Sequence, residues 1–203
     1  ELIVRESSPV RSSSPYGRTK EFLELALRDM SSVTDLQVVS LRYFNPIGAD
    51  PAMRSGIHVK RPSHVIGKLL DVANGTAPSF SLTGTGWPTR DGSGIRDYIH
   101  VWDLAQAHVE AVVRFSDIFR TPAEPEDTDS FRVINLGSGS GVTVKELVAA
   151  FEDIWGKKIA VTICGPRAGD VAGAFASREK ALRLLDWAPK LTLHEAIRHT
   201  CLL

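Results

Sequence analysis

Tyr16 and Lys20 are the residues of this chain whose types and spacing point most directly to catalysis. Four residues apart on a helix, they would project from one face as neighbours. A phenol is a weak base at neutral pH because its reference pKa is about 10, but a nearby ammonium and the positive end of a helix dipole both favour the phenolate. Such a pair could move a proton to or from a substrate hydroxyl, although the same spacing also occurs on ordinary surface helices.

A helix must carry this pair, and the sequence predicts one from residue 15 to about residue 30. Ser14 followed by Pro15 is the usual order of an N-cap and a first helical residue. The apolar side of this helix is expected to consist of Phe22, Leu23, Leu25, Ala26 and Leu27.

Strands and helices alternate along the rest of the chain, which predicts an α/β fold. Two capping boxes, Thr143 with Glu146 and Thr192 with Glu195, mark the starts of two further helices. Residues 116–130 are acidic, contain two prolines and are expected to form an exposed insertion loop. Other helices are expected at 64–73 and 101–115, and strands at 36–43, 80–82, 97–100, 131–136 and, as the last one, 160–163.

Composition excludes several classes of protein. The 203 residues carry 24 acidic and 24 basic side chains, a balance that argues against a nucleic-acid or anionic-membrane surface. No apolar run approaches the roughly 20 residues that span a bilayer, and the first residues are not typical of a signal peptide. Cys164 and Cys201 are far apart and have no metal-ligand spacing, so we expect no metal site and a reducing compartment, the cytoplasm.

A glycine-rich turn between a strand and a helix, which binds the pyrophosphate of a dinucleotide, does not occur in this sequence. The chain also begins a few residues before a helix that should lie deep inside a larger enzyme. We therefore expect it to be a fragment.

Five segments in a fixed order give the chain a family resemblance. From about residue 6 to residue 200 it closely resembles the UDP-glucose 4-epimerases of the extended short-chain dehydrogenase/reductase family. The segments are SPYGRTK, LRYFNPIGA, DGSGIRDYIHVWDLA, NLGSGSGVTV and GPRAGD.

The resemblance implies an α/β fold made of the end of a Rossmann-type NAD-binding domain and a smaller α/β UDP-sugar-binding domain. Residues 1–50 would belong to the first domain and residues 51–203 mostly to the second, with 97–136 returning to the NAD domain. The cofactor would be NAD and the substrate a UDP-sugar.

The resemblance also implies roles for individual residues. Tyr16 would be the catalytic acid and base, and Lys20 would tune it and hold the nicotinamide ribose. Tyr43 and Phe44 would lie against the cofactor, unless they simply pack at a strand end. Asn45 would hydrogen-bond the nucleotide sugar.

Residues later in the chain would hold the rest of the substrate. Arg96 and Arg167 match arginines that bind the diphosphate, a role that suits a permanently charged guanidinium. Asp170 would bind the ribose hydroxyls, or alternatively form a structural pair with Arg167. Ala174 would face the sugar's 2-position and leave room for an N-acetyl group, unless Phe175 fills that space.

Other conspicuous residues are expected to be structural, and three positions depart from the family pattern. The NLGSGSG segment is expected to be a turn, and a family Ser or Thr would lie upstream of residue 1. Ser63 and His64 stand where relatives often have an Asn-Leu pair that contacts UDP, and Thr83 replaces an aromatic near the uracil. The residues expected to be structural are Asp97, Asp103 and His100.

The implied activity is NAD-dependent interconversion of UDP-glucose and UDP-galactose at C4, in a homodimer paired through the Tyr16 helix. We expect this chain to be inactive alone. A 4,6-dehydratase, a decarboxylating relative or a non-catalytic binding fragment remain alternatives.

Overall fold

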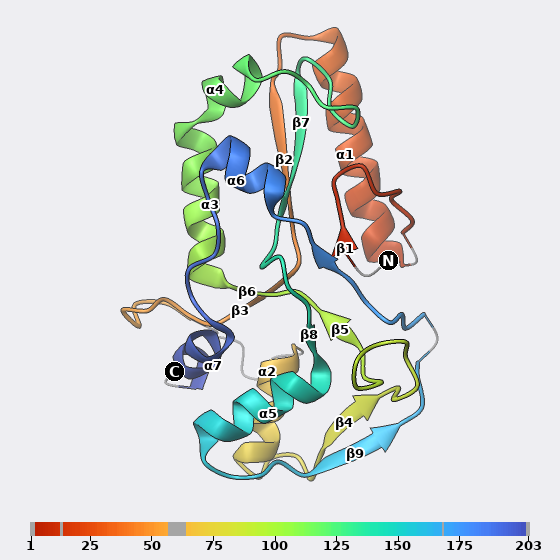
Figure 1. Ribbon diagram of the computed structural model, residues 1–203, viewed down its shortest axis with the longest axis vertical. Coiled ribbons are helices and arrows are strands. Elements are labelled where there is room, and N and C mark those ends of the chain that lie inside the picture. Colours follow the sequence, from red (N-terminus) through yellow and green to blue (C-terminus); the bar gives the residue numbers. More distant parts are fainter. Residues whose placement is uncertain (1–2, 13, 57–63, 168, 202–203) are drawn as a thin grey trace.

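The computed structural model describes residues 3–12, 14–56, 64–167 and 169–201, and Figure 1 shows their arrangement. The helices are α1 (Pro15–Val33), α2 (Val65–Ala73), α3 (Val101–Val113), α4 (Phe115–Arg120), α5 (Val144–Trp155), α6 (Glu179–Leu185) and α7 (Leu193–Cys201). The strands are β1 (Ile3–Val4), β2 (Val38–Tyr43), β3 (Asn45–Ile47), β4 (Phe80–Thr83), β5 (Ile95–Arg96), β6 (Tyr98–His100), β7 (Phe131–Leu136), β8 (Val142–Thr143), β9 (Val161–Cys164) and β10 (Phe175–Ala176).

One region of the molecule, here called the β2–β7 region, is built on the parallel pair of β2 and β7. α1 lies on one side of this pair, and α3, α4 and α6 lie on the other (Figure 1). Because side chains alternate along a strand, Val39 and Leu41 pack on the α3 side, while Ser40 and Arg42 bond to Glu24 of α1. α1 is therefore attached partly through polar contacts.

The second region, the α2–α5 region, contains α2, α5, α7 and the parallel pair of β4 and β9 (Figure 1). Its core is separate from that of the β2–β7 region. β6 runs between the two cores, since Tyr98 packs in one and Ile99 in the other. The largest side chains that are fully buried in the second core are Phe151, Ile66, Leu69, Leu147 and Ile197.

Helix starts agree with the sequence-based predictions. Ser14 caps α1, its hydroxyl accepting a hydrogen bond from the Gly17 amide at 3.0 Å. The Thr143–Glu146 capping box is formed at α5, and the Thr192–Glu195 box is formed just before α7. Strong local rules of this kind act within a few residues, which is why the sequence alone reveals them.

The prediction of an exposed loop at 116–130 is wrong. Its first part is α4, whose Ile118 is buried in the core of the β2–β7 region. Its acidic residues do not simply face solvent, because the buried Lys180 ammonium of α6 lies 2.9 Å from Glu126 and 2.7 Å from Asp127. The positive charge of Lys180 therefore anchors the acidic end of this segment to α6. The local sequence does not reveal a contact between segments so far apart.

The final strand is also different from the prediction. The strand expected at 160–163 is β9, Val161–Cys164, and it is followed by β10, which pairs in parallel with β1. At two residues, β10 is too short to show a hydrophobic period.

Candidate functional site

A cavity of about 420 Å³ is lined by residues of β3, β5 and β6 together with α2, β4 and α5, and it contains several of the predicted substrate-binding residues. Asn45, Arg96 and Arg167 line it together, although they are far apart in sequence. The other lining residues are Pro46, Ile47, His64, Val65, Lys68, Phe80, Ser81, Thr83, Tyr98 and Val144.

Strand geometry places the cavity residues of β3, β5 and β6. Arg96 and Tyr98 are two residues apart and both line the cavity, and Asn45 is the parallel partner of Tyr98. Asp97, between them, points the other way. Its buried carboxylate accepts hydrogen bonds from the amides of Ser138 (2.9 Å) and Ala176 (2.9 Å), so it has the predicted structural role.

Arg96 is held by backbone rather than by a carboxylate. Its Nη1 donates to the carbonyl oxygen of Ile95 at 2.7 Å and, more weakly, to that of Ala172 at 3.3 Å. A Cβ at Gly173, whose φ is +106°, would lie 1.8 Å from the Ile95 oxygen and 2.3 Å from Arg96 Nη1. Only glycine allows the backbone to approach Arg96 this closely. Because the two carbonyl oxygens accept from Nη1 alone, the rest of the guanidinium remains available to a ligand.

Arg167 does not form the alternative pair with Asp170. The Asp170 carboxylate instead accepts a hydrogen bond from the Arg167 backbone amide at 2.8 Å, and the Arg167 side chain makes no ion pair with any described residue. Its guanidinium is thus free to bind an anion. Asp170 shapes the turn and is not among the residues that line the cavity.

Tyr98 is a cavity residue that sequence reasoning missed. Burial raises the pKa of Tyr98 to about 12, with Arg96 opposing the shift, so its hydroxyl stays protonated and can donate a hydrogen bond. The available signal was its spacing from Arg96, because residues two apart on a strand share a face.

The start of α2 forms the opposite wall. His64 is the N-cap, and its Nδ1 accepts from the Gly67 amide at 3.3 Å, which leaves the proton on Nε2. Burial lowers the pKa of His64, so the ring is neutral at physiological pH. Lys68, also missed from the sequence, lines the cavity with His64 and Thr83. Ser63 lies outside the described residues.

Tyr16 and Lys20 are neighbours, as their spacing predicts, but they lie outside this cavity. The Lys20 ammonium is 5.3 Å from the centre of the Tyr16 ring, and Tyr16 is 71% exposed. Tyr43 is also exposed, and Phe44 is half-buried. The start of α1 and the end of β2 both lie at the end of the β2–β7 region that faces the α2–α5 region (Figure 1).

Ala174 is half-buried beside β10 and does not line the cavity. The Phe175 ring approaches the backbone of Gly141 so closely that a Cβ there would lie 2.6 Å from its Cδ1. The edge of the Phe175 ring therefore lies close to the Gly141 backbone.

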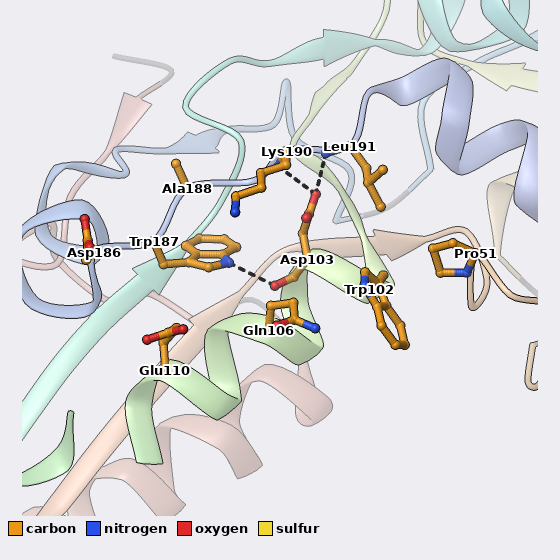
Figure 2. Close-up of a pocket in the computed structure, with 10 residues that line it drawn as sticks. All are labelled: Pro51, Trp102, Asp103, Gln106, Glu110, Asp186, Trp187, Ala188, Lys190 and Leu191. Atoms are coloured by element: carbon orange, nitrogen blue, oxygen red, sulfur yellow. Dashed lines mark hydrogen bonds between the residues drawn. The ribbon is translucent and has the colours of Figure 1, made fainter. Parts of the chain in front are cut away.

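A second cavity, of about 370 Å³, contains none of the predicted site residues (Figure 2). The Asp103 carboxylate at its wall accepts from the amides of Lys190 (3.0 Å) and Leu191 (2.8 Å), and the Asp103 carbonyl accepts from Trp187 Nε1 (3.0 Å). Asp103 joins α3 to the segment before α7 and is structural, as predicted.

His100 is also a structural residue. It is buried, its Nδ1 accepts from the Trp102 amide at 3.0 Å, and its Nε2 lies 2.9 Å from Nδ1 of His199. The NLGSGSG segment forms a turn between β7 and β8, with Ser138 bonded to Asp97.

No group of three or more His, Cys, Asp or Glu residues in the described part of the chain could hold a metal ion. No helix in that part is long and apolar enough to cross a membrane.

Residues 3–120 match the model of the NAD dependent epimerase/dehydratase family. The chain belongs to this family. Its relatives in the family include UDP-glucose 4-epimerase 2 of Arabidopsis thaliana, which is 40% identical over 98% of this chain and 55% of its own length. UDP-glucose 4-epimerase of Bacillus subtilis is 39% identical over 95% of this chain and 54% of its own length.

Solved structures in the family have the same Rossmann-like α/β fold. UDP-glucose-4-epimerase from Stenotrophomonas maltophila, with bound NAD and formylated UDP-arabinopyranose, is 37% identical with a TM-score of 0.87, over 97% of this chain and 56% of that one. The enzyme from Bifidobacterium longum, in complex with NAD+ and UDP, is 34% identical with a TM-score of 0.85, over 98% and 57%. The chain thus spans about half the length of the relatives it matches.

Proposed function

We propose that this chain is the UDP-sugar-binding part of an enzyme that interconverts UDP-glucose and UDP-galactose at C4 with NAD. The observation that carries the proposal is the cavity, in which Arg96 and Arg167 present guanidinium groups without a carboxylate partner among the described residues. Guanidinium groups bind phosphate oxygens bidentately, and relatives of this family are named as UDP-glucose 4-epimerases.

The cavity offers complementary groups for the rest of the nucleotide sugar. Asn45 at the start of β3 and the Tyr98 hydroxyl can hydrogen-bond the sugar, since both lie next to Arg96. Asp170 is proposed to bind the ribose hydroxyls with the carboxylate oxygen that the Arg167 amide leaves available.

The described residues are proposed to hold only one part of NAD. Tyr16 and Lys20 are at the start of α1 and Tyr43 ends β2, and with Phe44 they are proposed to hold the nicotinamide side of the cofactor. The sequence has no glycine-rich turn to hold its pyrophosphate. The chain is therefore proposed to need a further segment for tight NAD binding, and to be inactive alone.

The proposed chemistry divides between cofactor and protein. NAD, when bound, supplies reversible hydride exchange at the sugar C4. The Tyr16 phenolate accepts the proton of the 4-hydroxyl and later returns it, and the Lys20 ammonium stabilises that phenolate. The cavity holds the nucleotide while the sugar presents either face.

Assembly and location follow as further proposals. Phe22, Leu23 and Leu25 of α1 are exposed, which supports pairing of two copies through this helix in a homodimer. Both cysteines are free, which is consistent with the cytoplasm.

Tyr16→Phe in a full-length protein tests the proposed acid–base role. The turnover number should fall by about 10²–10⁴-fold, the usual contribution of a general acid–base group, with UDP-sugar affinity nearly unchanged. The assay follows UDP-galactose conversion and identifies the product. Tyr43→Phe is the matched control and should keep turnover within a few fold.

Three outcomes would count against parts of this proposal. A loss of less than tenfold for Tyr16→Phe would place the base elsewhere. A 4-keto-6-deoxy sugar or a decarboxylated product would indicate another nucleotide-sugar enzyme. No turnover in the parent full-length protein would favour a non-catalytic binding role.

A further inference from the structure

Lys68, which was not predicted from the sequence, lines the cavity from the first full turn of α2. It follows the N-cap His64 by four residues, so the two side chains share a face of the helix. Ile66 and Leu69 occupy the opposite, buried face. Helical side chains lean toward the N-terminus, which directs the Lys68 ammonium toward the positive end of the α2 dipole instead of away from it.

The charge of this cavity is unbalanced. Lys68 joins Arg96 and Arg167, and no Asp or Glu is among the described residues that line the cavity. None of these three cations forms an ion pair with any residue in the described ranges. Elsewhere, basic side chains commonly have carboxylate partners: Arg42 with Glu24, Arg54 with Asp50, Arg90 with Glu146 and Lys180 with Asp127.

Gathering like charges in one concave site raises their free energy unless an anion binds there. His64 does not add to this charge because burial keeps it neutral. The cavity is therefore suited to a ligand with more than one negative charge.

We propose that Lys68 is a third phosphate-contacting residue, which strengthens binding of the diphosphate of the nucleotide sugar. This rests on the proposed function, since it takes the UDP-sugar as the ligand. Arg96 is fixed by two carbonyl oxygens, whereas the ammonium of the exposed Lys68 makes no hydrogen bond with a described residue.

That difference predicts how Lys68 acts. An ammonium is a point charge on a flexible stem and does not impose the bidentate geometry of a guanidinium. Lys68 should therefore raise affinity through charge without orienting the sugar. Its contribution should increase with the number of phosphates and weaken as salt screens the exposed charge.

Calorimetric titration of this chain and of Lys68→Ala with UDP, UMP and uridine tests the inference. We expect Lys68→Ala to raise the Kd for UDP by about 5–10-fold at low salt, the Kd for UMP by less, and the Kd for uridine not at all. Lys68→Arg should keep most of the affinity for UDP. Lys157→Ala, which removes an exposed lysine beyond the end of α5, is the matched control and should leave all three ligands unchanged.

The outcomes separate this inference from the proposed function. An unchanged Kd for UDP in Lys68→Ala, with UDP binding by the parent chain, overturns the role of Lys68 alone. An equal loss for UDP and uridine also overturns it, because it would mean that α2 has shifted. If the parent chain binds no UDP, the proposed function fails and this inference fails with it.

Discussion

The cavity and the start of α1 hold the two halves of the proposed chemistry, and the described residues enclose them to different degrees. Arg96 and Tyr98 lie on strands fixed from behind by the buried Asp97 carboxylate. Tyr16 is 71% exposed on a helix that meets its sheet through the Glu24–Arg42 pair. The residues proposed to bind the nucleotide therefore lie in a cavity within this chain, whereas the proposed acid–base pair is positioned but not covered.

The largest expected effect is that the chain alone has the nucleotide-binding half of the proposed chemistry and lacks the catalytic half. The 203-residue chain should bind UDP but should neither bind NAD tightly nor epimerise UDP-galactose. The physical reason is that no helix N-terminus with a glycine-rich turn is present to hold the pyrophosphate. Calorimetry with each ligand and a coupled turnover assay would measure this.

Micromolar NAD binding with turnover would contradict the difference between the two sites. It would show that the exposed face of α1 is sufficient for the cofactor. A circular dichroism spectrum of the same preparation is the control that the chain is folded.

Sequence reasoning was most successful where a local rule or a motif decides the structure. The capping box at Thr143 and the N-cap at Ser14 were predicted, because each depends on near neighbours. Asp97 was predicted only to be structural, and its amide partners, Ser138 and Ala176, could not be named from the sequence. The resemblance supplied Asn45, Arg96 and Arg167, and the structure brings these three into one cavity.

The failures concern contacts between distant segments. Lys180 pairs with Asp127 across 53 residues, and this buried contact made an apparent loop part of the core region. Lys68 and Tyr98 were missed because each becomes a site residue only when α2 and β6 face the same cavity. A sequence shows that a lysine is on a helix, but not which other charges that helix meets.

Arg96→Ala should have the next largest effect, and only on the nucleotide site. Removing a partly buried guanidinium that binds the diphosphate should raise the Kd of this chain for UDP by about 30–100-fold. Arg96→Lys keeps the charge but loses the fork, so it should recover only part of the affinity. Calorimetry with UDP measures both.

Arg120→Ala is a suitable comparison, because Arg120 forms an exposed pair with Asp117 on α4, away from the cavity residues. It should leave the Kd for UDP unchanged. If Arg96→Ala instead lowered turnover of a full-length protein without changing UDP affinity, the diphosphate role would be wrong.

The smallest expected effect concerns Ala174, which lies just before β10 and is proposed to set the range of sugars. It follows Asp170 by four residues and precedes Phe175, whose ring edge lies close to the Gly141 backbone. A methyl side chain leaves room for an acetamide at the sugar's 2-position, and steric exclusion is the main way in which such a pocket rejects a larger sugar.

We therefore expect a full-length protein to accept UDP-N-acetylglucosamine as well as UDP-glucose. Ala174→Tyr should lower kcat/KM for the N-acetylated sugar by roughly tenfold relative to UDP-glucose, and Ala174→Ser, which stays small, should not. If the parent protein already excludes the N-acetylated sugar, Ala174 is only a small residue before β10, and the sugar range is set inside the cavity.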